Sequence, residues 1–182
     1  MNTKIVTFLA SLLFILSCGQ SPNAEHPTPP SLVGVWTTQC KQNAIDKSGL
    51  SNGSGDYSIE KIIVDGTSRL YYEKAVYGKA DPNCNLFNPT MVSEYYTYST
   101  NDTVKTIKDT YGIDLIPEIG KSTSAVAQSG IYRVNKNGAT DPVTNTTKDI
   151  LDIAISTNKE STFTTSNTTT YTKDTTLQAV IP

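Results

Sequence analysis

Apolar and polar residues alternate along most of the chain after residue 33, with the period of two that is typical of half-buried β-strands. Residues 55–66 show this pattern most clearly, with Glu60 and Ile62 on the same side of the predicted strand. Residues 67–78 repeat it, and the Asp65-Gly66 pair at the junction is a strong signal for a tight turn. These two segments are therefore predicted to pair as an antiparallel hairpin.

Similar alternation recurs later in the chain. The further predicted strands are residues 91–100, 103–117 with an irregular end at Pro117, 129–138 ending at an Asn-Gly turn, and 149–158. The Thr-rich residues 161–174 are predicted to form an edge or exposed strand, and residues 176–182 to close the sheet. Residues 123–128 are the one predicted helical turn. About eight to ten short strands separated by turns predict an all-β fold, an antiparallel barrel or a sandwich.

The amino terminus has the pattern of a secretory signal. Lys4 precedes an apolar run over residues 5–16, which is shorter than the ~20 residues of a membrane-spanning helix. The run ends in Ile-Leu-Ser-Cys at residues 15–18, which resembles the lipobox of bacterial lipoproteins. An ordinary secretory signal cleaved nearby is the alternative.

The lipobox resemblance implies a cleaved and acylated chain. It implies removal of residues 1–17 as a signal peptide and attachment of acyl chains such as palmitate at Cys18, which would anchor the protein to a membrane. Gly19 follows the Cys, which favours the outer membrane within the cell envelope. Residues 18–32 contain four prolines and no apolar periodicity, so they are predicted to form an extended tether. Residues 33–182 are then a single β-barrel domain.

The segment LVGVW at residues 32–36 contains the single Trp of the chain and resembles the Gly-x-Trp signature that opens the first strand of lipocalin-like (calycin) barrels. This resemblance is carried by Gly34 and Trp36. It implies that Trp36 is buried at one closed end of the barrel, where early and late strands meet, and that an Arg packs across its ring. Arg133 is preferred for this role over Arg69 because it lies in the later half of the chain.

Two cysteines remain once Cys18 is assigned to lipid. In an oxidising compartment Cys40 and Cys84 are predicted to form a disulfide. A metal site is the rival interpretation, but it needs further ligands, and the single His, His26, lies in the predicted tether. No metal and no cofactor are therefore expected.

Catalytic motifs are missing from this sequence. The predicted domain contains no His, which excludes Ser-His-Asp and Cys-His arrangements, so the protein is predicted not to be an enzyme. Glu60, Glu73 and Glu94 lie on adjacent predicted strands, which raises the possibility of a carboxylate pair, but they are expected on the outer face of the sheet. A net charge of −2 gives no electrostatic footprint for nucleic acid.

Tyrosine is the most distinctive residue type. Seven of the ten tyrosines fall on three consecutive predicted strands, and neighbours such as Tyr71 and Tyr72 must point to opposite faces.

Two functions fit the sequence. The first is a membrane-anchored envelope lipoprotein whose barrel binds a small apolar ligand through residues that the sequence does not identify. The alternative is a non-enzymatic module that binds a protein or a glycan on a lipid tether.

Overall fold

The computed structural model describes residues 29–42, 56–85, 88–103, 108–121, 125–140, 145–157, 162–164 and 168–182. The predicted signal peptide, Cys18, His26 and most of the tether lie outside these residues. Within the described ranges, no helix is long and apolar enough to cross a bilayer. The described part of the chain is built from strands and their connections.

Nine strands occur in the described residues. Their bounds are β1 Gly34–Thr37, β2 Lys41–Gln42, β3 Tyr57–Val64, β4 Arg69–Tyr77, β5 Thr90–Thr103, β6 Tyr111–Pro117, β7 Gln128–Thr140, β8 Thr147–Ser156 and β9 Thr169–Asp174. Every pairing between them is antiparallel. The all-β prediction is confirmed.

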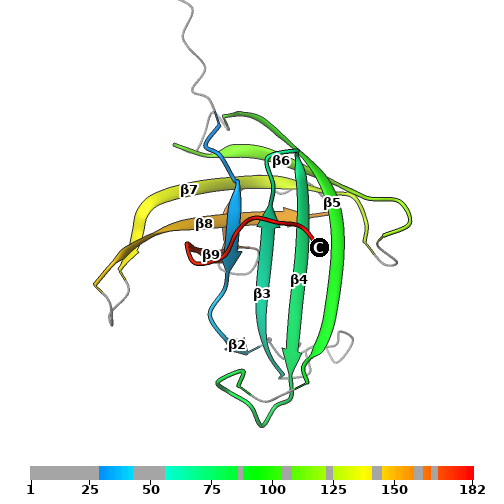
Figure 1. Ribbon diagram of the computed structural model, residues 1–182. Coiled ribbons are helices and arrows are strands. Elements are labelled where there is room, and N and C mark those ends of the chain that lie inside the picture. Colours follow the sequence, from blue (N-terminus) through cyan, green and yellow to red (C-terminus); the bar gives the residue numbers. More distant parts are fainter. Residues whose placement is uncertain are drawn as a thin grey trace, which may run out of the picture.

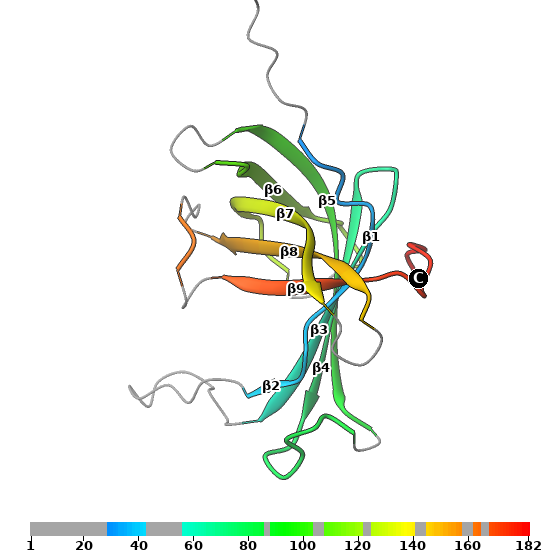
Figure 2. The same ribbon diagram turned by 90° about the vertical axis from the view of Figure 1, so that its left-hand side faces the viewer.

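The sheet closes on itself. Strands β3 to β9 pair in sequence order, β9 pairs with β1, and β1 pairs back onto β3, which makes a closed barrel of eight strands. β2 continues beyond β1 and adds a short pairing with β3 (Figure 1). β6 to β9 cross in front of β3, β4 and β5 at a steep angle (Figure 2). A closed barrel leaves its main strands without unpaired edges. Closure here requires β1, from the start of the domain, to pair with β9, from its end.

Side-chain alternation assigns each residue to the inside or the outside of the barrel. Ile62, Val64 and Leu70 belong to the interior cluster, whereas Ile63 and Tyr71 belong to a separate cluster on the outer surface. The β3–β4 hairpin has the predicted turn, in which a carboxylate oxygen of Asp65 accepts hydrogen bonds from the backbone amides of Thr67 and Arg69 and from the Thr67 hydroxyl. The hairpin prediction is confirmed.

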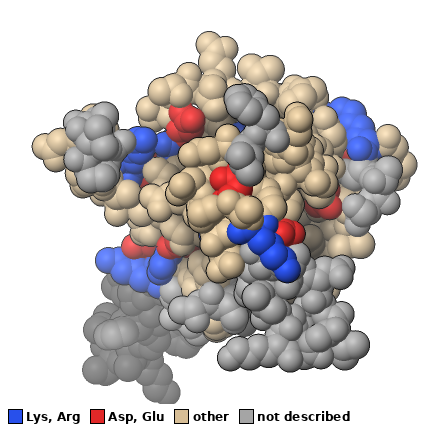
Figure 3. Space-filling model, turned by 90° about the horizontal axis from the view of Figure 1, so that it is seen from below, with Lys and Arg blue, Asp and Glu red and all other residues tan. Residues whose placement is uncertain are grey.

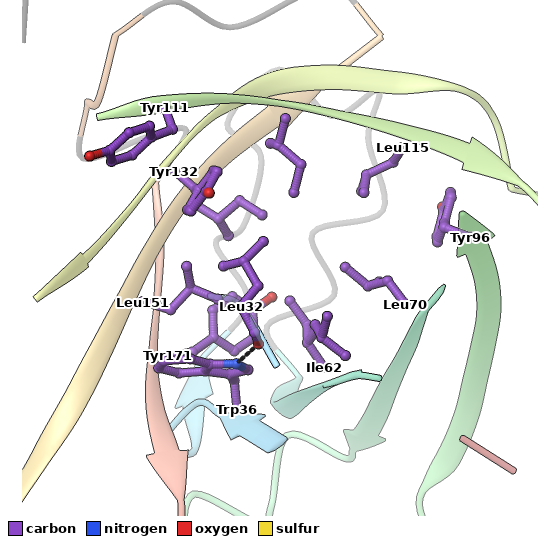
Figure 4. Close-up of a cluster of buried hydrophobic side chains, with 13 residues drawn as sticks. Leu32, Trp36, Ile62, Leu70, Tyr96, Tyr111, Leu115, Tyr132, Leu151 and Tyr171 are labelled. Carbon is purple, nitrogen blue, oxygen red and sulfur yellow. Dashed lines mark hydrogen bonds between the residues drawn. The ribbon is translucent and has the colours of Figure 1, made fainter. Parts of the chain in front are cut away.

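The interior cluster extends across the inside of the barrel, from Trp36 and Ile62 to Tyr111 and Leu115 (Figure 4). The Trp36 side chain is fully buried and packs with Leu151, Tyr132 and Tyr171. Leu32 lies in the same cluster, only 3% exposed, so the final residues of the predicted tether form part of the barrel core. The predicted burial of Trp36 between early and late strands is confirmed, because β1 pairs with β9 beside it.

Three predictions about the later strands are wrong. β9 pairs on both sides, with β8 and β1, so it closes the barrel and is not an edge strand. Residues 175–182 form no strand. Instead, Ala179 and Ile181 pack against the outer cluster of Val35, Ile63 and Tyr71. β7 continues through the predicted Asn-Gly turn, where the pairing shifts between Asn135 and Ala139.

The helical turn predicted for residues 123–128 is absent where the structure describes it. Residues 122–124 lie outside the described part, and residues 125–127 are irregular before β7 begins. The alanines of this segment favour a helix only weakly, because a single helical turn forms few backbone hydrogen bonds.

A disulfide joins Cys40 to Cys84, with the two Cα atoms 5.8 Å apart and 44 positions apart in sequence. It links the segment between β1 and β2 to the connection between β4 and β5. The predicted pairing is confirmed. The β1–β2 segment and the β4–β5 connection both lie at the β2 end of the molecule, opposite to the end at which the described chain begins (Figure 1).

Candidate ligand-binding cavity

The register of β3, β4 and β5 arranges the inward-facing side chains in three rows across the barrel wall. The row nearest β2 contains Glu60, Lys74 and Val92, the middle row Ile62, Tyr72 and Glu94, and the innermost row Val64, Leu70 and Tyr96. Because side chains directly opposite one another in a sheet are close neighbours, each row forms a continuous stripe. Charge is therefore concentrated in the two rows nearer β2, and the innermost row is apolar apart from the Tyr96 hydroxyl.

These rows line a cavity of about 390 Å³ inside the barrel. Its lining residues are Glu60, Ile62, Leu70, Tyr72, Lys74, Val92, Glu94, Tyr96, Leu115, Gln128, Ile153, Ile155, Thr169 and Tyr171. This volume lies within the range of ~300–1,000 Å³ that is usual for small-molecule sites. Six of these residues, Ile62, Leu70, Tyr96, Leu115, Ile153 and Tyr171, also belong to the interior cluster, whereas Trp36 and Leu32 belong to that cluster without lining the cavity.

Acidic and basic side chains lie close together near the middle of the β2 end of the molecule (Figure 3). Among the cavity residues, Glu60 is the more buried acid, at 7% exposure. Lys41 Nζ lies 3.0 Å from Glu60 Oε1 and Lys74 Nζ lies 3.7 Å from the same atom. The Tyr171 hydroxyl donates a 3.0 Å hydrogen bond to Glu60 Oε2. Two cations and a hydrogen-bond donor therefore compensate this buried carboxylate, as a buried charge requires.

Glu94 has a different environment. It is half-buried in the middle row, and the Tyr96 hydroxyl donates a hydrogen bond to its Oε2. Within the described residues Glu94 has no ion-pair partner. The carboxylate therefore faces the cavity with acceptor capacity to spare, since a carboxylate offers about four acceptor positions.

Tyr72 lies directly opposite Glu94 across the β4–β5 pairing. Burial is the largest cause that raises its pKa, and the nearby carboxylates of Glu60 and Glu94 raise it further. Burial and the hydrogen bond to Glu94 raise the pKa of Tyr96 in the same way. Both phenols are therefore protonated at neutral pH and can act as hydrogen-bond donors. In the described part of the chain, no hydrogen-bond partner of the Tyr72 hydroxyl is present.

The cation that covers the Trp36 ring is Lys173, not Arg133. Lys173 is the register partner of Trp36 on β9, and its Nζ lies 5.3 Å from the ring centroid. Arg133 instead donates through Nε to Asp152 at 2.8 Å and stacks 4.8 Å above the Phe163 ring. The prediction for Arg133 is wrong because β1 pairs with β9, whereas Arg133 lies on β7 with its register partner on β8.

Gly34 begins β1, two residues before Trp36. Its φ is +149°, a conformation that side-chain-bearing residues rarely adopt, and a Cβ there would lie 2.9 Å from Lys173 Cε. The glycine therefore allows the Lys173 side chain to cross the start of β1 and to reach the indole.

The expected outward position of the three glutamates is wrong for two of them. Glu60 and Glu94 face the cavity, and only Glu73 faces outward, where it forms an ion pair with Lys61 at 2.7 Å and accepts a hydrogen bond from Tyr71. The tyrosines also divide between the two faces: Tyr72 and Tyr96 line the cavity, and Tyr71 packs outside against Tyr95 with ring centroids 4.9 Å apart.

Sequence reasoning missed Lys74 and Tyr171 as cavity residues. The signal for Lys74 was present, because it shares the inward parity of Leu70 and Tyr72 in residues 67–78. Tyr171 lies in the Thr-rich segment that was predicted to be exposed, and only barrel closure through β9 directs it inward.

The comparisons add no relative to this description. No family model, no curated protein and no solved structure matches the chain. Among the described residues there is no group of three His, Cys, Asp or Glu side chains that could hold a metal ion. The function must therefore be argued from the cavity itself.

Proposed function

We propose that this protein is a lipid-anchored lipoprotein of the cell envelope whose lipocalin-like barrel binds a small, largely apolar ligand. The observation that carries this proposal is the cavity of about 390 Å³, walled by Ile62, Leu70, Leu115, Ile153 and Ile155, inside a closed barrel. Concave apolar sites with a few polar groups are the usual form of small-molecule sites.

The position of the cavity agrees with a tethered protein. The described chain begins at the end of the barrel opposite to β2 (Figure 1), and the cavity lining includes the row of Glu60, Lys74 and Val92 nearest β2. The chain therefore enters the barrel at the end away from this row of cavity residues. Acylation of Cys18, removal of residues 1–17 and an outer-membrane location rest on the lipobox resemblance.

The alternative, an interaction module, has less support from the geometry. Such a module would need an exposed strand edge or an exposed face of tyrosines as its binding surface. The eight barrel strands each pair on both sides, and the outer tyrosines Tyr71 and Tyr95 pack beside Ala179 and Ile181 of the carboxy-terminal segment. The cavity therefore favours ligand binding over an interaction module as the function.

Ligand binding is tested with N-phenyl-1-naphthylamine, a neutral apolar fluorophore that brightens when it leaves water. The Cys18→Ser chain avoids the need for detergent. We expect saturable binding of one fluorophore per chain. Val92 lines the cavity and its neighbour Met91, 49% exposed, does not, so Val92→Trp should abolish binding and Met91→Trp should preserve it. Equal binding by the two variants would contradict the proposed site.

Anchoring is tested separately. Replacement of Cys18 by Ser should release the protein from membranes and abolish metabolic labelling with palmitate. Labelling that persists in this variant would contradict the assignment of Cys18 as the lipid attachment site.

A further inference from the structure

The two carboxylates that line the cavity, Glu60 and Glu94, differ in their ion-pair partners. Glu60 is held by Lys41, Lys74 and Tyr171, so its charge is compensated within the protein. Glu94 has one hydrogen bond, from Tyr96, and no ion-pair partner among the described residues. Among the described residues, Glu94 is therefore the one carboxylate of the cavity lining that has no cation within 4.0 Å.

The groups around Glu94 suit a positive charge. Tyr72 lies opposite Glu94 across the sheet and Tyr96 lies two residues along the same strand, so aromatic rings are placed on two sides of the carboxylate. Aromatic faces attract cations, and a partly buried carboxylate such as that of Glu94 attracts them more strongly than one in water. The free Tyr72 hydroxyl can accept a hydrogen bond from the same cation.

The apolar wall continues inward from this position. Leu70 is in the innermost row beside Tyr96, and Leu115 and Ile153 line the cavity from β6 and β8. A ligand with one charged end and an apolar body can therefore place its charge at Glu94 and its body against these side chains.

We infer that the cavity selects amphipathic amines, with the ammonium group bound by Glu94 between Tyr72 and Tyr96. This inference deepens the proposed function and depends on it. An anionic head group would instead need Lys74, but Lys74 is already directed to Glu60, and the Glu94 carboxylate would repel a negative charge.

Three probes with the same eight-carbon chain separate charge from apolar burial. They are octylammonium, 1-octanol and octanoate at pH 7, each measured by displacement of N-phenyl-1-naphthylamine from the Cys18→Ser chain. We expect octylammonium to bind about tenfold more tightly than 1-octanol, because charged hydrogen bonds in a cavity are worth more than neutral ones. Octanoate should bind most weakly.

Glu94→Gln keeps the size of the side chain and removes its charge. In this variant the preference for octylammonium over 1-octanol should fall to within about threefold, while the affinity for 1-octanol changes by no more than about twofold. Glu73→Gln is the matched control, because Glu73 faces outward on the neighbouring strand and pairs with Lys61. It should keep the full preference.

The outcomes distinguish this inference from the proposed function. Three results would overturn the amine assignment and leave the ligand cavity in place. The parent could bind octylammonium and 1-octanol equally, or it could bind octanoate most tightly. The preference for octylammonium over 1-octanol could also be lost in Glu73→Gln as well as in Glu94→Gln. If the fluorophore itself fails to bind to the cavity, the proposed function fails, and the amine assignment fails with it.

Discussion

The indole Nε1 of Trp36 donates a 2.8 Å hydrogen bond to the backbone carbonyl oxygen of Leu32 (Figure 4). This bond fixes the strand residue to the segment that enters the barrel, and the Leu32 side chain packs in the same cluster. The Tyr132 hydroxyl donates a second bond, of 3.3 Å, to the carbonyl oxygen of Pro30. The amino-terminal segment thus closes the barrel end with its side chain and its backbone together.

Removing the Trp36 side chain should destabilise the domain severely. Trp36→Ala is expected to reduce the free energy of unfolding by ~3–5 kcal/mol, because it leaves a large cavity in the packed end. Trp36→Phe should lose less, about 1–2 kcal/mol, since the ring remains and mainly the hydrogen bond to Leu32 is lost. Urea unfolding measures both. A Trp36→Ala variant that unfolds at the same urea concentration as the parent would contradict this account of the barrel end.

Reduction of the disulfide should lower stability without changing the fold. The bond between Cys40 and Cys84 closes a loop of 44 positions, which in the chain-entropy model corresponds to ~4 kcal/mol. Urea unfolding with and without reductant measures the difference. A Cys40→Ala, Cys84→Ala double variant must lose the sensitivity to reductant, and an unchanged midpoint on reduction of the parent would refute the prediction.

Close packing of two strands at Gly130 predicts intolerance of any side chain there. A Cβ on Gly130 would lie 1.9 Å from the backbone carbonyl oxygen of Ala154, which the β7–β8 pairing holds in place. Gly130→Ala should therefore reduce the free energy of unfolding by at least about 2 kcal/mol. Gly66→Ala is the control, because no atom lies within 4 Å of its added Cβ, and it should stay within about 0.5 kcal/mol.

The ion pair between Arg69 and Glu118 predicts a dependence of stability on pH. The hydrogen bond from Arg69, of 2.8 Å from Nε, is the largest cause that lowers the pKa of Glu118 below its ordinary value of 4.5. A lowered pKa means that the stabilisation is present above the ordinary value and is lost as the pH falls through the lower, folded value.

Thermal melts of Glu118→Gln and the parent test this dependence. At pH 7 the variant should melt about 1–2 °C lower, since partly exposed pairs contribute little. The difference should close as the pH falls below the ordinary glutamate range. A difference that is the same at pH 7 and at pH 3 would indicate a packing effect instead of the ion pair.

The strands of the first half could be predicted because alternation, turn residues and burial agree there. Residues 57–77 form the expected hairpin, and the inward face of Ile62 and Leu70 follows from parity alone. The Cys40–Cys84 disulfide could be predicted because only these two cysteines remain once Cys18 is assigned to lipid. Such local signals are reliable where tertiary structure does not oppose them.

The cavity could not be predicted because it depends on closure. The Thr-rich segment before residue 174 has little hydrophobicity, and its role as the closing strand depends on pairing with β1 and β8 far away in sequence. Once β9 closes the barrel, Tyr171 reaches Glu60 and Lys173 reaches Trp36. Acids were expected outside because charged residues are mostly exposed, and that rule fails where a cavity and nearby partners accommodate them.

A crystal structure of the Cys18→Ser chain with 8-bromooctylammonium tests the central claim most directly. The anomalous signal locates the bromine, and the electron density locates the ammonium group. We predict one molecule per chain, with the bromine near Leu115 and Ile153 and the ammonium group within hydrogen-bonding distance of Glu94. Bromine found only on the outer surface, or interior density without any ligand at saturating concentration, would contradict the claim that this barrel is a binding protein.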